Sequence, residues 1–272
     1  MFYAEKPFSG VTHIKDQMGV CFTLLEGSTR SILFDTGYGT ENADAYVRSL
    51  TEKPLTVLLS HGHHDHILGA RWFRNAFMCE EDMDEFRERT GPIQRRKVMK
   101  QAEQRGVNVP DDFMTAPIRR PEPVRFTDRI NEFECKQIDL GKLTVQIIKV
   151  PGHTPGSLVA FIPEYRLLLT GDNWNPCTWM WFPSSLSARE WRDNMLSLVG
   201  CLECKNGCSI DNVICPHQPG VHEGRELKDF LDYMNDKRMS EAPAADMGAP
   251  INTHQITEEM NGWILVFDRD KI

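Results

Sequence analysis

The sequence predicts a mixed α/β fold, because short apolar runs typical of buried strands alternate with longer segments that have a helical pattern. Four of the apolar runs lead into a histidine or an aspartate. The runs cover residues 55–60, 143–150, 166–170 and 212–215, and the polar side chains are His61, His153, Asp172 and His217. Strands fix the backbone while the turns after them project side chains, so sites are commonly built at strand ends. Four such cases together predict a functional site at these strand ends.

The N-terminal part is expected to begin with strands. Apolar residues at 20–25 and 32–34 predict two strands joined by a turn. Thr40 is expected to cap a helix that runs from residue 41 to about residue 50, because threonine is a favoured N-cap residue.

The middle of the chain is expected to be mostly helical. Residues 67–74 have a helical pattern, and residues 76–79 predict a short strand. Residues 80–104 are strongly helical in pattern, with an interruption at Gly91-Pro92. Residues 106–123 contain four prolines and are expected to form an ordered loop.

Two later elements complete the expected fold. An amphipathic helix is expected to start near Ser187, and residues 263–268 predict a strand. The helical segment 80–104 carries a basic group that we expect to face solvent: Arg95, Arg96, Lys97 and Lys100. The length allows one large or two small domains, and we take residues 1–272 as a single domain.

The densest group of ligand-type side chains is the hexad at residues 61–66, which contains His61, His63, Asp65 and His66. Imidazole and carboxylate groups suit Zn²⁺ and neighbouring transition metals. So short a stretch cannot easily direct all its ligands to one ion, whereas two ions that share a ligand or a water fit the spacing. The alternative is a solvated histidine-rich tract. The metal site is favoured over it, because such a tract would not lie between an apolar run and a helix-like segment.

This ordered set of motifs resembles the metallo-β-lactamase superfamily. The family pattern His-x-His-x-Asp-His stands at residues 61–66, and the matching motifs elsewhere are Asp35-Thr36-Gly37, Pro151-Gly152-His153, Thr170-Gly171-Asp172 and Cys215-Pro216-His217. The resemblance covers about residues 11–222. It implies a four-layer αββα metallo-β-lactamase sandwich with metals at one edge. We take residues 80–123 as a helical and loop insertion near the active site.

The resemblance also implies a ligand set for two ions per chain. One ion would be held by His61, His63 and His153, the second by Asp65, His66 and His217, and Asp172 would bridge them. Zn²⁺ is the expected metal, with iron or manganese as alternatives. A hydroxide that bridges the ions would attack the substrate. Asp65 is expected to orient this nucleophile and is the catalytic candidate.

Other polar residues are candidates for supporting roles. Ligating imidazoles usually donate their second N–H to a partner, and Asp35, Thr154 and Ser157 are candidates for such partners. His64 lies between ligands and is expected to line the substrate pocket, as is His222.

Composition agrees with a globular enzyme. Apolar residues make up 40% of the chain, and no apolar run is long enough to span a membrane. No signal peptide is apparent, so we expect a cytoplasmic protein without a membrane partner. The net charge of −8 argues against nucleic acid as a partner. A small-molecule substrate is expected, and a homodimer is left open. No motif surrounds His13 or His254, and both are expected at the surface.

The eight cysteines are expected to be free thiols. Cys201, Cys204 and Cys208 form a cluster with a spacing that is common in zinc and redox sites. However, the first two fall on the amphipathic helix, and free cysteine behaves as a small hydrophobe. Structural packing is therefore the favoured interpretation, with a second metal site as the alternative.

The stretch 173–182 is the best indication of the substrate. It follows a predicted ligand and carries four large aromatic side chains: Trp174, Trp179, Trp181 and Phe182. An aromatic lining suits an apolar or ring-containing substrate. A core or a dimer interface would account for these residues equally well.

The resemblance therefore implies a dinuclear metal-dependent hydrolase that cleaves a carboxylic ester, lactone or thioester. The family's lactonases often carry a tyrosine after the bridging aspartate, where this chain has Asn173 and Trp174. A phosphodiesterase is less favoured than a hydrolase of esters, lactones or thioesters. Two alternatives come from other classes: a flavodiiron-like oxidoreductase, which resembles this family but carries glutamate where His63 stands, and a metal-retaining ligand-binding protein without catalysis.

Overall fold

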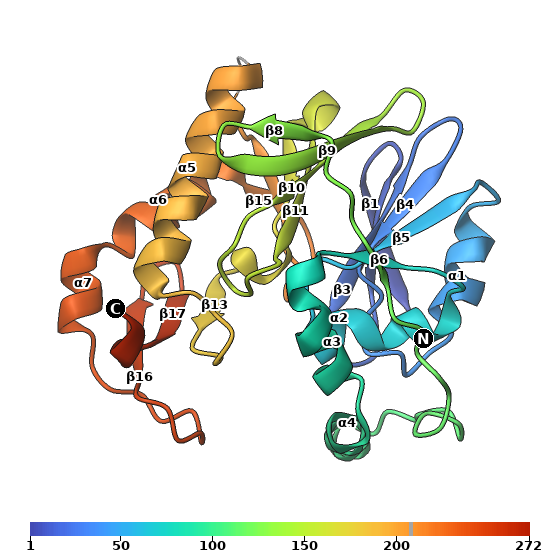
Figure 1. Cartoon of the computed structure of the whole chain (residues 1–272), viewed down its shortest axis with the longest axis horizontal. Coiled ribbons are helices and arrows are strands. Elements are labelled where there is room, and N and C mark those ends of the chain that lie inside the picture. Colours follow the sequence, from blue (N-terminus) through green and yellow to red (C-terminus); the bar gives the residue numbers. More distant parts are fainter. Residues whose placement is uncertain (207–208) are drawn as a thin grey trace. The chain divides into compact units, whose positions relative to one another are not determined.

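The computed structural model describes residues 1–206 and 209–272, which divide into two compact units (Figure 1). Unit 1 comprises Met1–Arg125, Gln137–Val145 and Pro216–Gly220. Unit 2 comprises Phe126–Lys136, Gln146–Cys215 and Val221–Ile272. Both units contain sheets and helices, which agrees with the predicted α/β class.

Unit 1 contains a seven-stranded sheet whose spatial order follows the sequence. Its strands are β1 (Tyr3–Phe8), β2 (Val11–Lys15), β3 (Cys21–Glu26), β4 (Ser31–Phe34), β5 (Leu55–Leu58), β6 (Phe77–Met78) and β7 (Glu122–Pro123). Strands β1 to β4 form an antiparallel meander, and β4 to β7 pair in parallel. The parallel pairs need crossover connections, which the predicted helical segments supply.

Helices cover one face of this sheet. They are α1 (Ala43–Leu50), α2 (His64–Ile67), η1 (Leu68–Trp72), η2 (Glu80–Asp82), α3 (Met83–Arg89) and α4 (Pro92–Gln104). Val47 of α1, Ile67 of α2 and Phe86 of α3 share a buried cluster with the strand residues Leu24 and Leu33. The predicted interruption at Gly91-Pro92 is confirmed, since it separates α3 from α4.

Three local expectations about unit 1 are wrong. Asn42, not Thr40, caps α1, because Asn42 directly precedes the first helical residue and its side chain accepts a hydrogen bond from the Ala45 amide at 2.9 Å. Arg95 does not face solvent. It is buried and donates to the carbonyls of Phe113 and Ala116, thereby anchoring the proline-rich loop. His13 is also buried.

Unit 2 is built on a second seven-stranded sheet of order β15-β14-β12-β11-β10-β9-β8. The strands are β8 (Asp128–Ile130), β9 (Phe133–Asp139), β10 (Thr144–Lys149), β11 (Leu158–Ile162), β12 (Leu167–Leu169), β14 (Asn212–Ile214) and β15 (His222–Glu223). A smaller sheet has the order β13 (Cys177–Met180), β17 (Trp263–Asp268) and β16 (Thr253–Glu258). All four apolar runs that lead into ligand-type residues are therefore strands in the structure.

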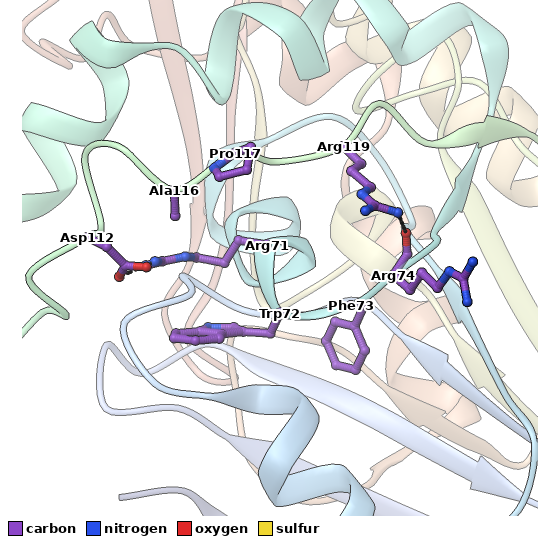
Figure 2. A pocket seen from close by; sticks show the side chains of 8 residues that line it. All are labelled: Arg71, Trp72, Phe73, Arg74, Asp112, Ala116, Pro117 and Arg119. Atoms are coloured by element: carbon purple, nitrogen blue, oxygen red, sulfur yellow. Dashed lines mark hydrogen bonds and ion pairs between the residues drawn. The ribbon is translucent and has the colours of Figure 1, made fainter.

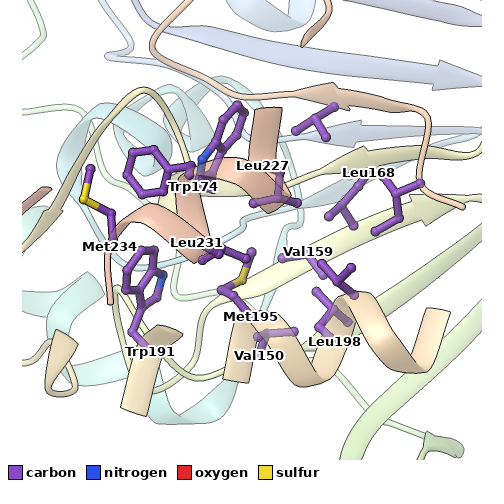
Figure 3. Close-up of a cluster of buried hydrophobic side chains, with 14 of the residues drawn as sticks. Val150, Val159, Leu168, Trp174, Trp191, Met195, Leu198, Leu227, Leu231 and Met234 are labelled. Carbon is purple, nitrogen blue, oxygen red and sulfur yellow. The ribbon is translucent and has the colours of Figure 1, made fainter. Parts of the chain in front are cut away.

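The helices of unit 2 are α5 (Ala188–Asn206), α6 (Gly224–Tyr233) and α7 (Asp236–Glu241), and its short turns are η3 (Pro163–Tyr165), η4 (Gly171–Asn173) and η5 (Arg269–Lys271). Figure 3 shows side chains of α5 and α6 packed against the larger sheet. Trp191 and Met195 of α5 and Leu227 of α6 lie in one cluster with Val159 and Leu168.

Asp16 is a buried carboxyl in the turn between β2 and β3. It accepts hydrogen bonds from the amides of Val20 at 3.0 Å and Tyr38 at 2.9 Å. Burial raises the pKa of Asp16 to about 6, although these backbone bonds oppose the rise. A folded-state pKa above the unfolded value of 3.8 means that the folded protein prefers the protonated acid.

The stability that Asp16 contributes should therefore be fully present below its unfolded pKa and be lost as pH rises through about 6. A shift of this size corresponds to about 3 kcal/mol. We expect the free energy of unfolding of metal-free wild type, relative to metal-free Asp16→Asn, to fall by about that amount between about pH 4 and pH 7. Urea unfolding of both proteins across this range measures the difference, and parallel pH profiles would contradict it.

Candidate metal centre

The hexad 61–66 connects β5 to α2 in unit 1. Its backbone path requires Gly62, because a Cβ there would lie 2.7 Å from the Cβ of Glu85. The rings of His61 and His66 are 4.2 Å apart between centroids, and those of His61 and His63 are 4.8 Å apart. The turn therefore gathers three imidazoles in one small volume.

Asp35 of the Asp-Thr-Gly motif supports the hexad through hydrogen bonds, as expected from the sequence. The buried Asp35 carboxylate accepts hydrogen bonds from the Ser60 amide at 2.6 Å and the Ser60 hydroxyl at 2.8 Å, and lies 3.0 Å from Nδ1 of His66. Ser60 Oγ in turn is 2.9 Å from Nδ1 of His61. Both rings thus have Nδ1 engaged and Nε2 available, which is the usual arrangement of ligating imidazoles.

His63 is held in a different way. Its Nε2 is 3.4 Å from Oε1 of Glu85, which also accepts from Nε of Arg89 at 2.6 Å. Burial raises the pKa of Glu85, but the hydrogen bonds and charges of His63 and Arg89 outweigh burial and lower that pKa to about 2. Glu85 is therefore ionised and lies beside the Nε2 edge of the His63 ring. Sequence reasoning missed Glu85, because nothing distinguishes it from the other charged residues of its helix.

Asp65, His66 and His217 form the second group in unit 1. Their ligand atoms lie within 4.8 Å of one another. Oδ2 of Asp65 is 3.6 Å from Nε2 of His66 and 3.7 Å from Nε2 of His217. Such spacings are too long for direct hydrogen bonds and leave room for an ion between the donors.

Unit 2 contains two further candidate ligands, His153 and Asp172. Nε2 of His153 is 3.5 Å from Oδ2 of Asp172. Nδ1 of His153 is 2.8 Å from the carbonyl oxygen of Trp179, so that this carbonyl fixes the ring. The His153 main chain is held by the Asn173 side chain at 2.9 Å and by the Ser185 hydroxyl at 2.7 Å.

Thr154 and Ser157, two of the candidate partners for ligating imidazoles, lie just after His153. Thr154 and Ser157 hydrogen-bond each other at 2.8 Å and shape the turn after His153, while the ring itself is held by the Trp179 carbonyl. Asn173, which sequence reasoning did not select for this role, also donates to the Val150 carbonyl at 2.8 Å. It therefore ties the ligand turn to the end of β10.

His64 belongs to neither group of candidate ligands, although its Nδ1 lies 3.7 Å from Oδ1 of Asp65. Its ring packs edge-on against Tyr38, with centroids 5.5 Å apart. Burial lowers the pKa of His64 to about 4, so that the ring is neutral near pH 7. The expected substrate-pocket role of His64 stays a prediction.

The aromatic stretch 173–182 divides into two parts. Trp174 is fully buried in the core of unit 2 (Figure 3). Its ring meets the rings of Phe230 and His222 edge-on. His222 is in addition 3.1 Å from a carboxylate oxygen of Glu226. These contacts account for Trp174 and His222 as packing residues.

The other three aromatic residues form a surface cluster beside a ligand. Trp181 stacks on Phe182 with centroids 4.6 Å apart, and Trp179, which is 39% exposed, lies 5.9 Å from Trp181. Phe182 meets the ring of His153 edge-on at 5.4 Å. Lys271 Nζ donates to the carbonyls of Phe182, Pro183 and Ser185, which holds the loop after Phe182 in place.

In the part of the cysteine cluster that the structure describes, Cys201 has the packing role that was favoured. Cys201 is buried in the core of unit 2, and its sulfur accepts a hydrogen bond from Asn131 at 2.7 Å. Cys204 is exposed. Cys208 lies outside the described residues.

These donor sets suit a metal ion. The model of the metallo-beta-lactamase superfamily matches residues 19–202, more than half of the chain, so the chain belongs to this superfamily. An uncharacterized protein of Mycobacterium tuberculosis is 31% identical over 158 residues, which are 56% of this chain and 62% of that protein. An uncharacterized protein of Mycobacterium leprae is 27% identical and is covered over 66% of its length.

Solved structures confirm the predicted fold. An inverting sec-alkylsulfatase from a Pseudomonas species has a TM-score of 0.63 and 16% identity, with 88% of this chain and 43% of that one covered. The mono-zinc form of the metallo-beta-lactamase FIM-1 from Pseudomonas aeruginosa has a TM-score of 0.56 and 16% identity, with 87% and 95% covered. Within the described residues, no helix has the length and apolar character needed to cross a bilayer.

Proposed function

We propose that this protein is a dinuclear metal-dependent hydrolase. The proposed ligands are His61, His63 and His153 for one ion, Asp65, His66 and His217 for the other, and Asp172 for both. The observation that carries the proposal is the support of the rings. His61, His66 and His153 each have Nδ1 within hydrogen-bond distance of an oxygen, which presents Nε2 for coordination.

Two divalent ions would supply an acidified water as nucleophile and a Lewis acid for the acceptor oxygen of the substrate. Zn²⁺ fits the imidazole and carboxylate donors best, with iron or manganese as alternatives. Asp65 would hold the attacking water through a carboxylate oxygen and accept its proton. Asp35 and Glu85 would keep the imidazoles from turning during the reaction.

We further propose a small carboxylic ester, lactone or thioester as the substrate, bound without a nucleic acid or membrane partner. Members of this superfamily are generally hydrolases. The exposed ring of Trp179 and the half-buried rings of Trp181 and Phe182 beside His153 support an apolar or ring-containing acyl group.

A panel of substrates with one common acyl group tests this function. The metal-loaded protein should hydrolyse at least one of a phenyl ester, a δ-lactone and a thioester, and activity should disappear with a chelator and return with Zn²⁺. An alkyl sulfate and a phosphodiester belong in the panel, because one structural neighbour is a sulfatase. Turnover of only those two would overturn the acyl assignment. Iron and flavin in the purified protein, with no hydrolysis, would favour the oxidoreductase alternative.

The aromatic cluster should affect recognition more than metal binding. We expect Trp179→Ala and Trp181→Ala to raise KM or change acyl preference, with a loss of about 1 to 3 kcal/mol in apolar contact and unchanged metal content. Trp191→Phe in the core serves as the control and should lower the melting temperature without changing acyl preference. If both surface variants keep wild-type preference, the cluster does not bind the substrate.

A further inference from the structure

A cavity lies in unit 1, and none of the proposed metal ligands lines it. Its volume is about 430 Å³, which is in the range of small-molecule sites. Figure 2 shows the lining residues: Arg71, Trp72, Phe73, Arg74, Asp112, Ala116, Pro117 and Arg119. They come from η1 and the residues just after it, and from the proline-rich loop that precedes β7.

Arg71 is the central group of this cavity. Its side chain is only 2% exposed, yet it carries a full charge. One guanidinium nitrogen pairs with Asp112, and the guanidinium carbon lies 4.5 Å from the ring centroid of Trp72 (Figure 2). The other terminal nitrogen, Nη1, is buried and has no hydrogen-bond partner among the described residues. Leaving such a donor unsatisfied is costly, because burial strips it of water.

A second unsatisfied donor lies beside it. Nε1 of Trp72 is also buried without a hydrogen-bond partner among the described residues. Two neighbouring N–H donors of one cavity thus lack an acceptor. Native proteins pair most buried polar groups, so a ligand that carries acceptor oxygens would satisfy both.

The charges around the cavity select the sign of that ligand. Three arginines line it against the single carboxylate of Asp112. Arg74 and Arg119 are exposed at its rim. A further cation, Arg95, donates to the carbonyls of Phe113 and Ala116 in the same proline-rich loop, and burial and then the charge of Arg71 lower its pKa. A cation is disfavoured here, and an anion would relieve the excess positive charge.

We propose that this cavity is a binding site for a small organic anion whose phosphate or carboxylate oxygens accept hydrogen bonds from Arg71 and Trp72. Arg74 and Arg119 attract the anion, since guanidinium groups match the geometry of both oxyanions. The ligand's body would occupy the space between Phe73 and the turn at Ala116 and Pro117. The site is separate from the proposed hydrolytic centre and does not depend on it.

The test is calorimetric titration at low ionic strength with four probes: inorganic phosphate, phenylphosphonate, benzoate and the neutral benzamide. Anions also bind exposed metal ions, so each titration is done with metal-loaded and metal-depleted protein. We expect phenylphosphonate or benzoate to bind at a site that persists without metal, and benzamide not to bind. The preferred probe tells a phosphate ligand from a carboxylate ligand.

Two double variants identify the site. Arg74→Ala/Arg119→Ala should raise the dissociation constant of the metal-independent site by about tenfold or more. Arg30→Ala/Arg87→Ala removes the same charge from exposed arginines outside the cavity and should leave binding unchanged. Arg71→Met should abolish binding. If Arg71→Met fails to fold, Arg74→Ala/Arg119→Ala still tests the proposal, because both of these arginines are exposed.

Three results would overturn the proposal. One is the absence of anion binding to metal-depleted wild-type protein. Another is equal binding by the rim variant and the control variant, which would indicate a general charge effect. The third is equal binding of benzamide and benzoate, which would indicate an apolar site.

Discussion

Replacing Asp172 with alanine is expected to have the largest effect on activity of any single substitution. Asp172 is the only carboxylate among the proposed ligands in unit 2, and its Oδ2 lies 3.5 Å from Nε2 of His153. As the group proposed to serve both ions, its loss would remove a shared ligand and a negative charge from between two dications. We expect metal content to fall from two ions per chain to one or fewer.

The rate should fall accordingly. We expect a decrease of about 1,000-fold in kcat/KM, which corresponds to about 4 kcal/mol of transition-state stabilisation. Elemental analysis and initial rates measure the two effects on the same preparation. Asp236→Ala, at an exposed position of α7, is the matched control. Two tightly bound ions and near wild-type turnover in Asp172→Ala would exclude the shared-ligand role.

Replacing Asp35 with alanine is expected to have the largest effect on stability. The change would leave the Ser60 amide, the Ser60 hydroxyl and Nδ1 of His66 without their buried acceptor. Asp35 also has a φ of 69°, a left-handed conformation that alanine adopts at a cost. Together these losses should lower the free energy of unfolding of the metal-free protein by about 4 kcal/mol.

Metal affinity should fall as well, by about 10- to 100-fold, because His66 would lose the group that orients it. Asp35→Asn is the informative control. Asparagine tolerates the left-handed conformation and keeps one acceptor oxygen, so this variant should lie between wild type and alanine in both measurements. Denaturant unfolding and competition with a chromophoric chelator provide the data. An alanine variant with wild-type metal affinity would show that Asp35 does not orient His66.

The strand ends that carry ligand-type residues were predictable, because their signals are local. Apolar runs mark β5, β10, β12 and β14, and the turns after them carry the ligand-type residues in short motifs. The Asp-Thr-Gly motif likewise located Asp35. In each case the residue and its structural reason lie within a few positions of one another.

The supporting contacts were not predictable, because they join distant segments. Glu85 reaches His63 from a helix whose charged residues all look alike in sequence. The His153 ring is held by the main chain of Trp179, and any residue provides a carbonyl. Arg95 was expected in solvent because its neighbours are basic, and only the packing of the proline-rich loop shows why it is buried. Trp174 and Trp179 belong to one aromatic stretch, and the fold alone separates core from surface.

The hydrogen bond that Nδ1 of His153 donates to the Trp179 carbonyl has a consequence for how this protein can change. Strand β13 points Thr178 and Met180 inward and the Trp179 side chain outward. The side chain at position 179 can therefore be exchanged while the backbone oxygen that holds the ligand stays where it is. Selection, natural or in the laboratory, can reshape this patch of surface without disturbing the neighbouring imidazole. Position 179 is thus a suitable first site for diversification in an evolved variant library.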